Sequence, residues 1–221
     1  MGRMITTDQQ HPSREALDAA YEVLAHGGVL VMPTDSVYGI GCAALPNNPA
    51  HQRIFAIKHR DLTQTLPLLV ADPQDLDRYG DEVPSWARAA AEAFWPGALT
   101  LVVRASRLVG EQYVKPAAPS EVPTVALRCP DSAFVRTLAR SLGCALATTS
   151  ANTHGLAAPA DGAHIEARIV EEADLTVDGG PAPCAIASTI VDCTHEKPRL
   201  LREGSISYRE FMRAVGMGGR I

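Results

Sequence analysis

The stretch covering residues 29–41 constrains the fold of this chain more than any other part of the sequence. Its first four residues, 29–32, are all apolar and lie between turn-forming glycine and proline, a pattern that predicts a buried β-strand. The chain then becomes polar, with Thr34, Asp35 and Ser36 in succession. Ligands of open α/β sheets bind beyond the carboxyl ends of strands, so these side chains predict a binding site. A capped turn without further function explains the same residues equally well.

Strands and helices alternate along most of the chain. Apolar runs predict strands at 29–32, 66–70, 98–103, 125–127, 144–147, 175–177, 186–191 and 200–201. Capping residues and helical spacing of apolar side chains predict helices at 14–26, 49–60, 72–76, 84–95, 131–142, 165–172 and 208–215, with Ser13 and Asp131 among the caps. The irregular spacing of these elements favours one α/β domain with an open, mixed sheet and flanking helices over a strictly parallel sheet.

The ends of the chain and one internal segment lack these patterns. Residues 1–12 are polar and are predicted to be a flexible N-terminus. Residues 106–123, which are rich in proline near their end, are predicted to form a mobile surface loop. Residues 208–221 are predicted to form a C-terminal helix and tail, which leaves 13–207 as the domain itself.

Composition excludes several classes of protein. The net charge of −5 argues against a protein whose whole surface binds nucleic acid. No apolar run approaches the ~20 residues of a membrane span, and the N-terminus lacks the apolar core of a signal peptide, so a cytoplasmic protein without membrane association is expected. The five cysteines form no Cys-x-x-Cys pair and the seven histidines show no ligand spacing, which argues against a disulfide framework or a protein-held metal.

Three polar clusters are predicted at the ends of elements: residues 34–38, Lys58 with Arg60, and residues 148–152. Each also has a purely structural interpretation, since cations at a helix C-terminus complement the helix dipole and short polar residues form turns. The chain has neither a P-loop nor a Gly-x-Gly-x-x-Gly fingerprint after a strand. If a nucleotide binds, its phosphates must therefore be held by side chains and turn amides.

Taken together, these clusters resemble the threonylcarbamoyl-AMP synthases with a YrdC-like domain, in their single-domain form. Residues 33–41 match the family's Pro-Thr-(acid/Ser)-x-Tyr-Gly-x-Gly stretch, Lys58-His59-Arg60 matches its Lys-x-Arg, and Ser150-Ala151-Asn152 matches its Ser-x-Asn. Four other stretches also match, and all seven occur in the family's order along the chain. The four are Trp95-Pro96-Gly97 with Thr100, Arg128 before Pro130, Ser188-Thr189 before Val191-Asp192, and Arg202 before Gly204. No single match is specific, but seven in order are, and the likeness runs from about Ser13 to Ser207.

The resemblance implies a fold, a reaction and a set of site residues. The implied fold is an open, twisted α/β sheet with a concave basic groove. The implied enzyme is a nucleotidyltransferase that converts L-threonine, bicarbonate or CO2 and ATP to threonylcarbamoyl-AMP and pyrophosphate, for N6-threonylcarbamoyladenosine at position 37 of tRNA. By position, ATP would be held by Lys58, Arg60, Ser150, Asn152 and Arg202, with Lys58 and Arg60 as the catalytic residues, and threonine by Thr34, Tyr38, Arg128 and Ser188.

The chemistry of this reaction requires fixed positive charge more than a covalent enzyme intermediate. Negative charge develops on the phosphates, so Lys58, Arg60, Arg202 and a Mg²⁺ ion would be the main catalytic resource. No general base is obvious; Asp35 is a candidate, although a role in the turn explains it better. The small diffusible product implies weak or no tRNA binding and a downstream threonylcarbamoyl transferase complex as partner.

One departure from the family pattern leaves alternatives open. Members often carry Pro directly after the Lys-x-Arg arginine, and some have a histidine shortly downstream, whereas this chain has Asp61 to Leu66 and then Ala71. A carbamoyl-adenylate or carbamoyl-transfer enzyme on the same fold remains possible for that reason. A non-catalytic RNA-binding module is disfavoured by the acidic total and by the lack of aromatic residues interleaved with Lys and Arg.

Overall fold

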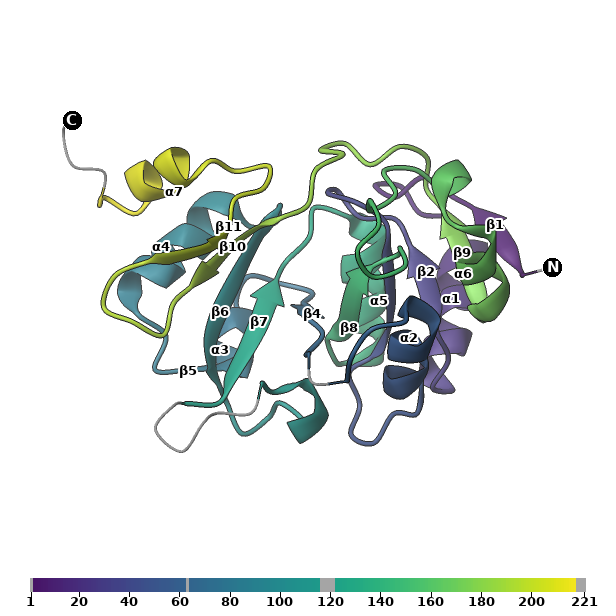
Figure 1. Ribbon diagram of the computed structural model, residues 1–221, viewed down its shortest axis with the longest axis horizontal. Helices are drawn as coiled ribbons and strands as arrows, with labels where there is room; N and C mark the ends of the chain where they lie inside the picture. Colours follow the sequence, from purple (N-terminus) through teal and green to yellow (C-terminus); the bar gives the residue numbers. More distant parts are fainter. Residues whose placement is uncertain (1, 63, 116–121, 218–221) are drawn as a thin grey trace.

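A computed structural model describes residues 2–62, 64–115 and 122–217. Within these residues eleven strands form one sheet in the order β1-β9-β2-β3-β8-β4-β7-β6-β10-β11, with β5 paired to β6 (Figure 1). Their bounds are β1 Met4–Thr6, β2 Leu30–Met32, β3 Gly39–Ala43, β4 Leu68–Leu69, β5 Gly80–Asp81, β6 Leu99–Ala105, β7 Thr124–Arg128, β8 Leu146–Ser150, β9 Leu175–Asp178, β10 Thr189–Asp192 and β11 Arg199–Arg202. Parallel pairs (such as β4 with β7) and antiparallel pairs (such as β3 with β8) both occur, which confirms the predicted mixed sheet.

Helices cover both faces of this sheet. Their bounds are α1 Arg14–Ala25, α2 Ala50–Lys58, α3 Asp75–Tyr79, α4 Ser85–Phe94, α5 Ala133–Leu142, α6 Ala167–Glu172 and α7 Tyr208–Ala214, with 3-10 turns at Glu111–Tyr113 and Gly162–His164. Leu30 and Met32 of β2 pack with α1 and α5, whereas Val29 and Val31 pack with Ile54 and Phe55 of α2. A strand buried on both faces must be apolar throughout, which accounts for the uninterrupted run at 29–32.

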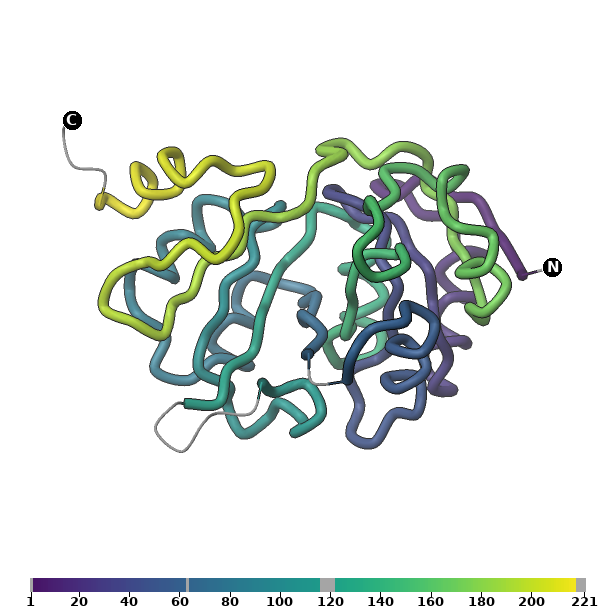
Figure 2. Tube along the Cα trace, in the orientation of Figure 1, coloured from purple at the N-terminus to yellow at the C-terminus, as the bar shows by residue number. Residues whose placement is uncertain are grey.

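The sheet narrows at β4. Leu68 and Leu69 pair with Leu127 and Arg128 of β7 on one side and with Ala147 and Leu146 of β8 on the other. The two-residue β4 therefore joins a β8 half (β1, β9, β2, β3, β8) to a β6 half (β7, β6, β10, β11, with β5). Figure 2 shows the last crossing of the chain between the halves, along the segment from β9 to β10. Because neighbouring strands diverge beyond so short a connection, the region between the halves is open to a ligand.

The structure departs from the sequence expectations in three places. Met4–Thr6, within the predicted flexible N-terminus, pair in parallel with β9 because that strand would otherwise present an open edge. β3 was not expected, since it contains Gly39 and Gly41 and glycine disfavours strands. A Cβ at either glycine would collide with Thr148 on β8, so both are required for close packing of β3 on β8.

The third departure concerns a cap. Ser132, not Asp131, is the N-cap of α5, and its Oγ accepts a hydrogen bond from the Val135 backbone amide. Ser13 caps α1 as predicted. Part of the predicted mobile loop, 116–121, lies outside the described residues; before it, Tyr113 is buried and donates to the carbonyl oxygen of Leu45.

Candidate functional site

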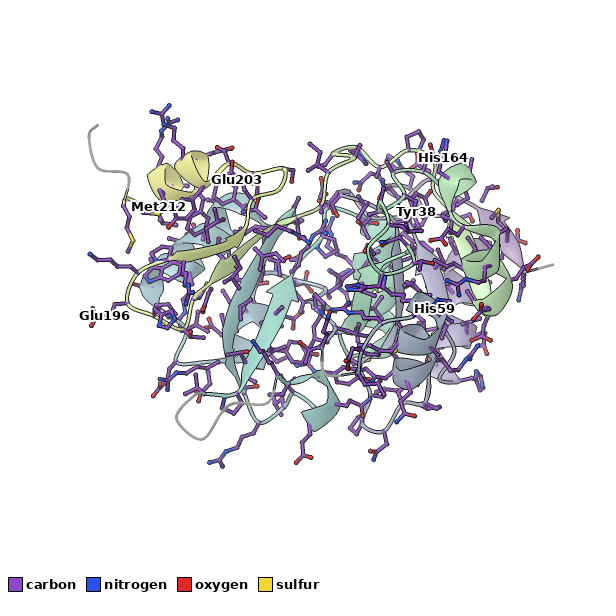
Figure 3. All side chains as sticks on the ribbon, viewed as in Figure 1. Tyr38, His59, His164, Glu196, Glu203 and Met212 are labelled. Atoms are coloured by element: carbon purple, nitrogen blue, oxygen red, sulfur yellow. The ribbon has the colours of Figure 1, made fainter. Side chains whose placement is uncertain are left out.

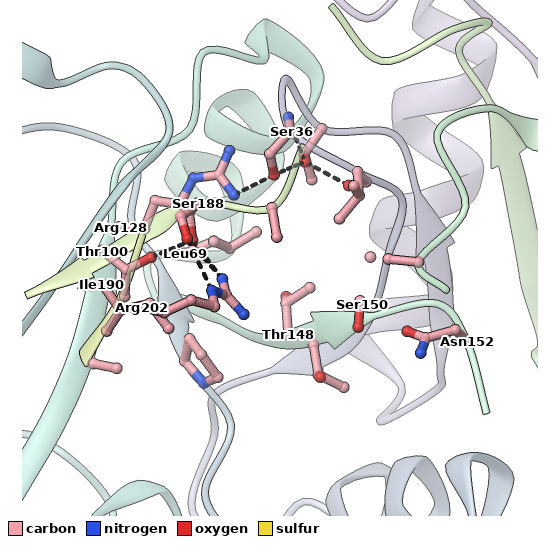
Figure 4. A pocket seen from close by; sticks show the side chains of 18 of the residues that line it. Ser36, Leu69, Thr100, Arg128, Thr148, Ser150, Asn152, Ser188, Ile190 and Arg202 are labelled. Carbon is pink, nitrogen blue, oxygen red and sulfur yellow. Dashed lines mark hydrogen bonds between the residues drawn. The ribbon is translucent and has the colours of Figure 1, made fainter. Parts of the chain in front are cut away.

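A cavity of about 580 Å³ lies between the two halves of the sheet. The β2–β3 connection and the ends of α2 and β8 line one side, and residues of β6, β7, β10 and β11 line the other (Figure 4). Its volume falls within the ~300–1,000 Å³ of ordinary small-molecule sites. The cavity contains every residue predicted to bind ATP or threonine: Thr34, Tyr38, Lys58, Arg60, Arg128, Ser150, Asn152, Ser188 and Arg202.

The charge of the cavity wall is one-sided. Four cations line it (Lys58, Arg60, Arg128 and Arg202), and among the described residues no Asp or Glu does. Burial lowers the pKa of Arg60 and of Arg202, and the neighbouring Arg128 lowers that of Arg202 further. Because these shifts disfavour the charged forms, an anion entering the cavity would relieve the electrostatic cost of holding the cations there.

Arg128 is the cation with its own counter-ion. Its guanidinium forms a buried ion pair with Asp35 and also donates to Ser36 Oγ (2.7 Å) and to the Gly97 carbonyl oxygen (3.0 Å). Asp35 and Arg128 are 4% and 6% exposed, so the carboxylate is shielded from solvent. Asp35 therefore acts here as the ion-pair partner that orients Arg128, a tertiary contact and not the role within the turn that was expected for it.

Arg202 lies with the predicted threonine residues. Its guanidinium donates to the carbonyl oxygen of Ser188 (2.8 Å) and to its Oγ (3.2 Å), and Ser188 Oγ is 2.8 Å from Thr100 Oγ1. Figure 4 shows Arg202, Ser188, Thr100 and Arg128 on one side of the cavity and Ser150 and Asn152 on the other. The structure thus groups Arg202 with Ser188 and not with the other residues predicted for ATP.

Lys58 is held more tightly than a helix-end cation would be. Its side chain is 2% exposed, and its Nζ donates to the carbonyl oxygens of Ser150 and Asn152 (2.5 Å for the latter). Burial, with a smaller contribution from Arg60, lowers the pKa of Lys58 to about 8. The interpretation of Lys58 as a cation that only complements the helix dipole does not account for these contacts, because the buried amine bonds to the turn that follows β8.

Arg60 reaches the cavity along a different path. His59 ends α2 with a left-handed backbone (φ 51°), which turns the chain between the two cations, and Arg60 lies 5.6 Å from the centre of the Phe55 ring. The guanidinium donates to Gln64 Oε1 (2.7 Å), Thr149 Oγ1 (2.9 Å) and the Thr65 carbonyl oxygen. None of these three contacts carries a formal charge, so the positive charge of Arg60 stays available to a ligand.

In the turn at 150–154, the backbone amides of residues 151–154 all donate hydrogen bonds to other groups of the protein. The amides of Ala151, Asn152 and His154 donate to the carbonyl oxygens of Tyr38, Ser150 and Lys58, and the Thr153 amide donates to Glu166. The expectation that turn amides would help hold phosphates is wrong for these four residues. Within this turn, phosphate recognition is left to side chains.

Two of the residues predicted for threonine also have structural bonds. The Tyr38 hydroxyl, which lies in the β8 half (Figure 3), donates to Asp178 and Gly180 and accepts from the Gly179 amide. Burial raises the pKa of Tyr38, so the phenol stays neutral. Thr34 Oγ1 donates to the Val37 carbonyl oxygen (2.6 Å) and accepts from the Ser36 amide, which shapes the β2–β3 connection.

Sequence reasoning missed several residues of the cavity wall. Gln64 and Thr65 lie in a loop without any motif, and His154, Leu156 and Leu201 were not singled out. Thr149 belonged to a predicted polar cluster, and strand alternation places it beside Arg60. Leu156 and Leu201 are more than half exposed and give the cavity apolar edges.

The described residues do not form a Mg²⁺ site of their own. No three His, Cys, Asp or Glu side chains converge in that part of the chain, and the cavity wall there has no carboxylate, the ligand that Mg²⁺ takes from proteins. The Mg²⁺ implied by the resemblance would have to be held by phosphate and water oxygens. In the described part of the chain, none of the helices has the length and apolar character required to cross a membrane.

The fold and the cavity define a class of protein. Its members have an open, mixed α/β sheet and a cationic, hydroxyl-lined cavity suited to an anionic small molecule. The model of the Sua5, YciO and YrdC family, described as "Telomere recombination", matches residues 22–204. The chain belongs to this family.

Three relatives place the chain within the family. The threonylcarbamoyl-AMP synthase of Bacillus subtilis is 30% identical over 210 residues, which are 95% of this chain and 59% of that protein. The structure of Pyrococcus abyssi Sua5 complexed with L-threonine is 29% identical with a TM-score of 0.88, over 97% of this chain and 61% of that one. Escherichia coli YciO is 25% identical with a TM-score of 0.81, over 92% and 96%.

These likenesses confirm the predicted fold and family. The chain spans about three fifths of the Bacillus and Pyrococcus relatives and nearly all of YciO. The shared length corresponds to the sheet with its flanking helices. Activity and substrates are therefore matters for proposal.

Proposed function

We propose that the chain is an L-threonylcarbamoyladenylate synthase, which forms threonylcarbamoyl-AMP and pyrophosphate from L-threonine, bicarbonate or CO2 and ATP. The observation that carries the proposal is the cavity wall, where four cations and a series of hydroxyl groups meet without any carboxylate among the described residues. A triphosphate and an amino-acid carboxylate are both anions, and both need this environment. The threonine bound to Pyrococcus abyssi Sua5 supports the choice of amino acid.

The proposed reaction divides the cavity into two ends. The threonine carboxylate and hydroxyl bind at the end formed by Thr34, Arg128 and Ser188. The phosphates bind at the end formed by Lys58, Arg60, Ser150 and Asn152, where Arg60 supplies the uncompensated charge. Arg202, which donates to Ser188, lies on the threonine side. It binds where the two substrates meet.

The proposed reaction has two chemical steps. The neutral amine of threonine adds to CO2 and loses a proton to water, which gives a carbamate. A carbamate oxygen attacks the α-phosphorus of ATP, and pyrophosphate leaves with the β- and γ-phosphates. Fixed cations lower the barrier because negative charge increases on the oxygens of the leaving pyrophosphate.

We expect pyrophosphate release only when threonine and bicarbonate are both present. Product identification by mass, in CO2-free buffer with each substrate omitted in turn, tests this. Valine, which has the shape of threonine without its hydroxyl, serves as the matched control and should react at least tenfold more slowly, because hydroxyl-binding groups would be left unpaired. Equal pyrophosphate release without an amino acid, or with carbamoyl phosphate as sole donor, would favour the carbamoyl-transfer alternative.

Binding of tRNA by the isolated chain is expected to be weak. The net charge of −5 disfavours a broad phosphate-binding surface, and the cations of the cavity are few and partly buried. Fluorescence titration with tRNA at ~0.15 M salt should show affinity that falls steeply as salt increases. Submicromolar binding that ATP does not displace would point to an RNA-binding module instead of an adenylate-forming enzyme.

A further inference from the structure

The N-terminus of α6 holds the turn that follows β8. The carboxylate of Glu166 accepts two hydrogen bonds from Thr153, one from its backbone amide (2.6 Å) and one from its hydroxyl (2.7 Å). Thr153 directly follows Asn152, whose carbonyl oxygen accepts from Lys58 Nζ. One carboxylate therefore helps to fix the segment that contains Ser150 and Asn152, in addition to Lys58.

Arg168, two residues further along α6, ties the same segment to α2. Its Nη2 donates to Thr153 Oγ1 (2.8 Å), and its Nη1 donates to the carbonyl oxygen of Ile57 (2.6 Å) and to Glu172 (2.9 Å). Ile57 precedes Lys58, so α6 connects the two segments that supply the proposed phosphate end of the cavity. Neither Glu166 nor Arg168 lines the cavity.

We propose that Glu166 is a positioning residue for nucleotide binding: through Thr153 it holds Ser150 and Asn152 in place beside Lys58. This inference rests on the proposed function, because it assigns the phosphates to that end of the cavity. A small displacement of a binding group costs affinity out of proportion to its size, and the bonds from Lys58 and from Glu166 both hold this turn.

The charge of Glu166 is part of this role. The two hydrogen bonds from Thr153, together with the nearby charges of Arg168 and Lys58, lower the pKa of the Glu166 carboxyl. An ionised carboxylate accepts from both donors at once, whereas an amide in its place has one acceptor and one donor group. A glutamine would therefore replace two charge-assisted bonds with neutral ones and present an N–H to a Thr153 hydroxyl that already accepts from Arg168, while it kept the size of the side chain.

The test compares Glu166→Gln with Glu172→Gln. Glu172 lies on the same helix and contacts the same arginine but not Thr153, so it is the matched control. Glu166→Gln should raise KM for ATP about tenfold, since lost charge-assisted bonds loosen the turn, and should change KM for threonine less than about twofold. Glu172→Gln should leave both constants near the wild type, and the two variants should have similar Tm.

A double-mutant cycle and a binding titration complete the test. If Glu166 acts through Thr153, Thr153→Val should also raise KM for ATP, although the backbone amide keeps its bond to Glu166, and the two effects should be less than additive in the double variant. Equal KM changes for both substrates, or Glu172→Gln matching Glu166→Gln, would overturn the positioning role. Calorimetric titration with a non-hydrolysable ATP analogue separates the two proposals. Loss of analogue affinity in Glu166→Gln would support the positioning role even if the wild type made no threonylcarbamoyl-AMP.

Discussion

Replacement of Arg60 by alanine should lower kcat/KM by about 10²–10³-fold, because a fixed charge aimed at developing phosphate charge contributes several kcal/mol to transition-state stabilisation. Arg60 lines the cavity and donates to neutral groups of Gln64, Thr149 and Thr65, so its charge is free to act on the ligand. The stability loss should be about 1 kcal/mol, since the partly buried groups left behind can bond to water. Steady-state kinetics and thermal denaturation of the same preparation measure both effects.

Arg53→Ala is the matched control for this experiment. Arg53 lies on α2, the helix that precedes Arg60, and bonds to Asp174 (2.8 Å) at an exposed site outside the cavity. Its removal should change kcat/KM by less than about twofold and stability by no more than about 1 kcal/mol. Near-normal turnover in Arg60→Ala would restore the interpretation of Arg60 as a cation that only complements the helix dipole.

Most of the fold could be predicted because the determining patterns are local. The apolar run at 29–32, the cap at Ser13 and the helical spacing of Phe134 and Leu138 in α5 are each set by neighbours in the sequence. β3 could not be predicted in the same way, because Gly39 and Gly41 contradict strand propensity. Glycine is required at both positions because Thr148 approaches them closely, and Thr148 is roughly a hundred residues away in the sequence.

The site was predictable as a set of residues but not as an arrangement. All nine predicted residues line one cavity, since each lies at, or within two residues of, an end of a strand or helix. The pairing of Arg128 with Asp35 and of Arg202 with Ser188 depends on tertiary contacts that no spacing reveals. The same holds for Lys58 and Arg60, which the left-handed His59 separates into a buried and a cavity-facing cation.

Replacement of Lys58 by methionine should reduce both activity and stability. Methionine keeps the length of the side chain but leaves the buried carbonyl oxygens of Ser150 and Asn152 without their donor, at a cost of about 1–3 kcal/mol in the free energy of unfolding. An exposed helix-end cation would contribute less than ~1 kcal/mol. Chemical denaturation measures the difference, and a Lys58→Met variant as stable as the wild type would show that the buried amine does not hold the turn.

The pH dependence of Lys58 gives a second readout, in which activity and stability move in opposite directions. Burial lowers the pKa of Lys58 to about 8 in the folded chain. In the unfolded chain the same amine has a pKa of ~10.4. Between these two pH values the amine is mostly neutral in the folded chain and mostly charged in the unfolded chain. The unfolded state therefore binds more protons in this interval, and the contribution of Lys58 to the free energy of unfolding rises with pH. Activity should instead fall above about pH 8, as the charged donor that orders the 150–152 turn disappears. Arginine stays charged over this range, so Lys58→Arg, if it retains activity at pH 7, should lose the falling limb; an unchanged limb would assign it to another group.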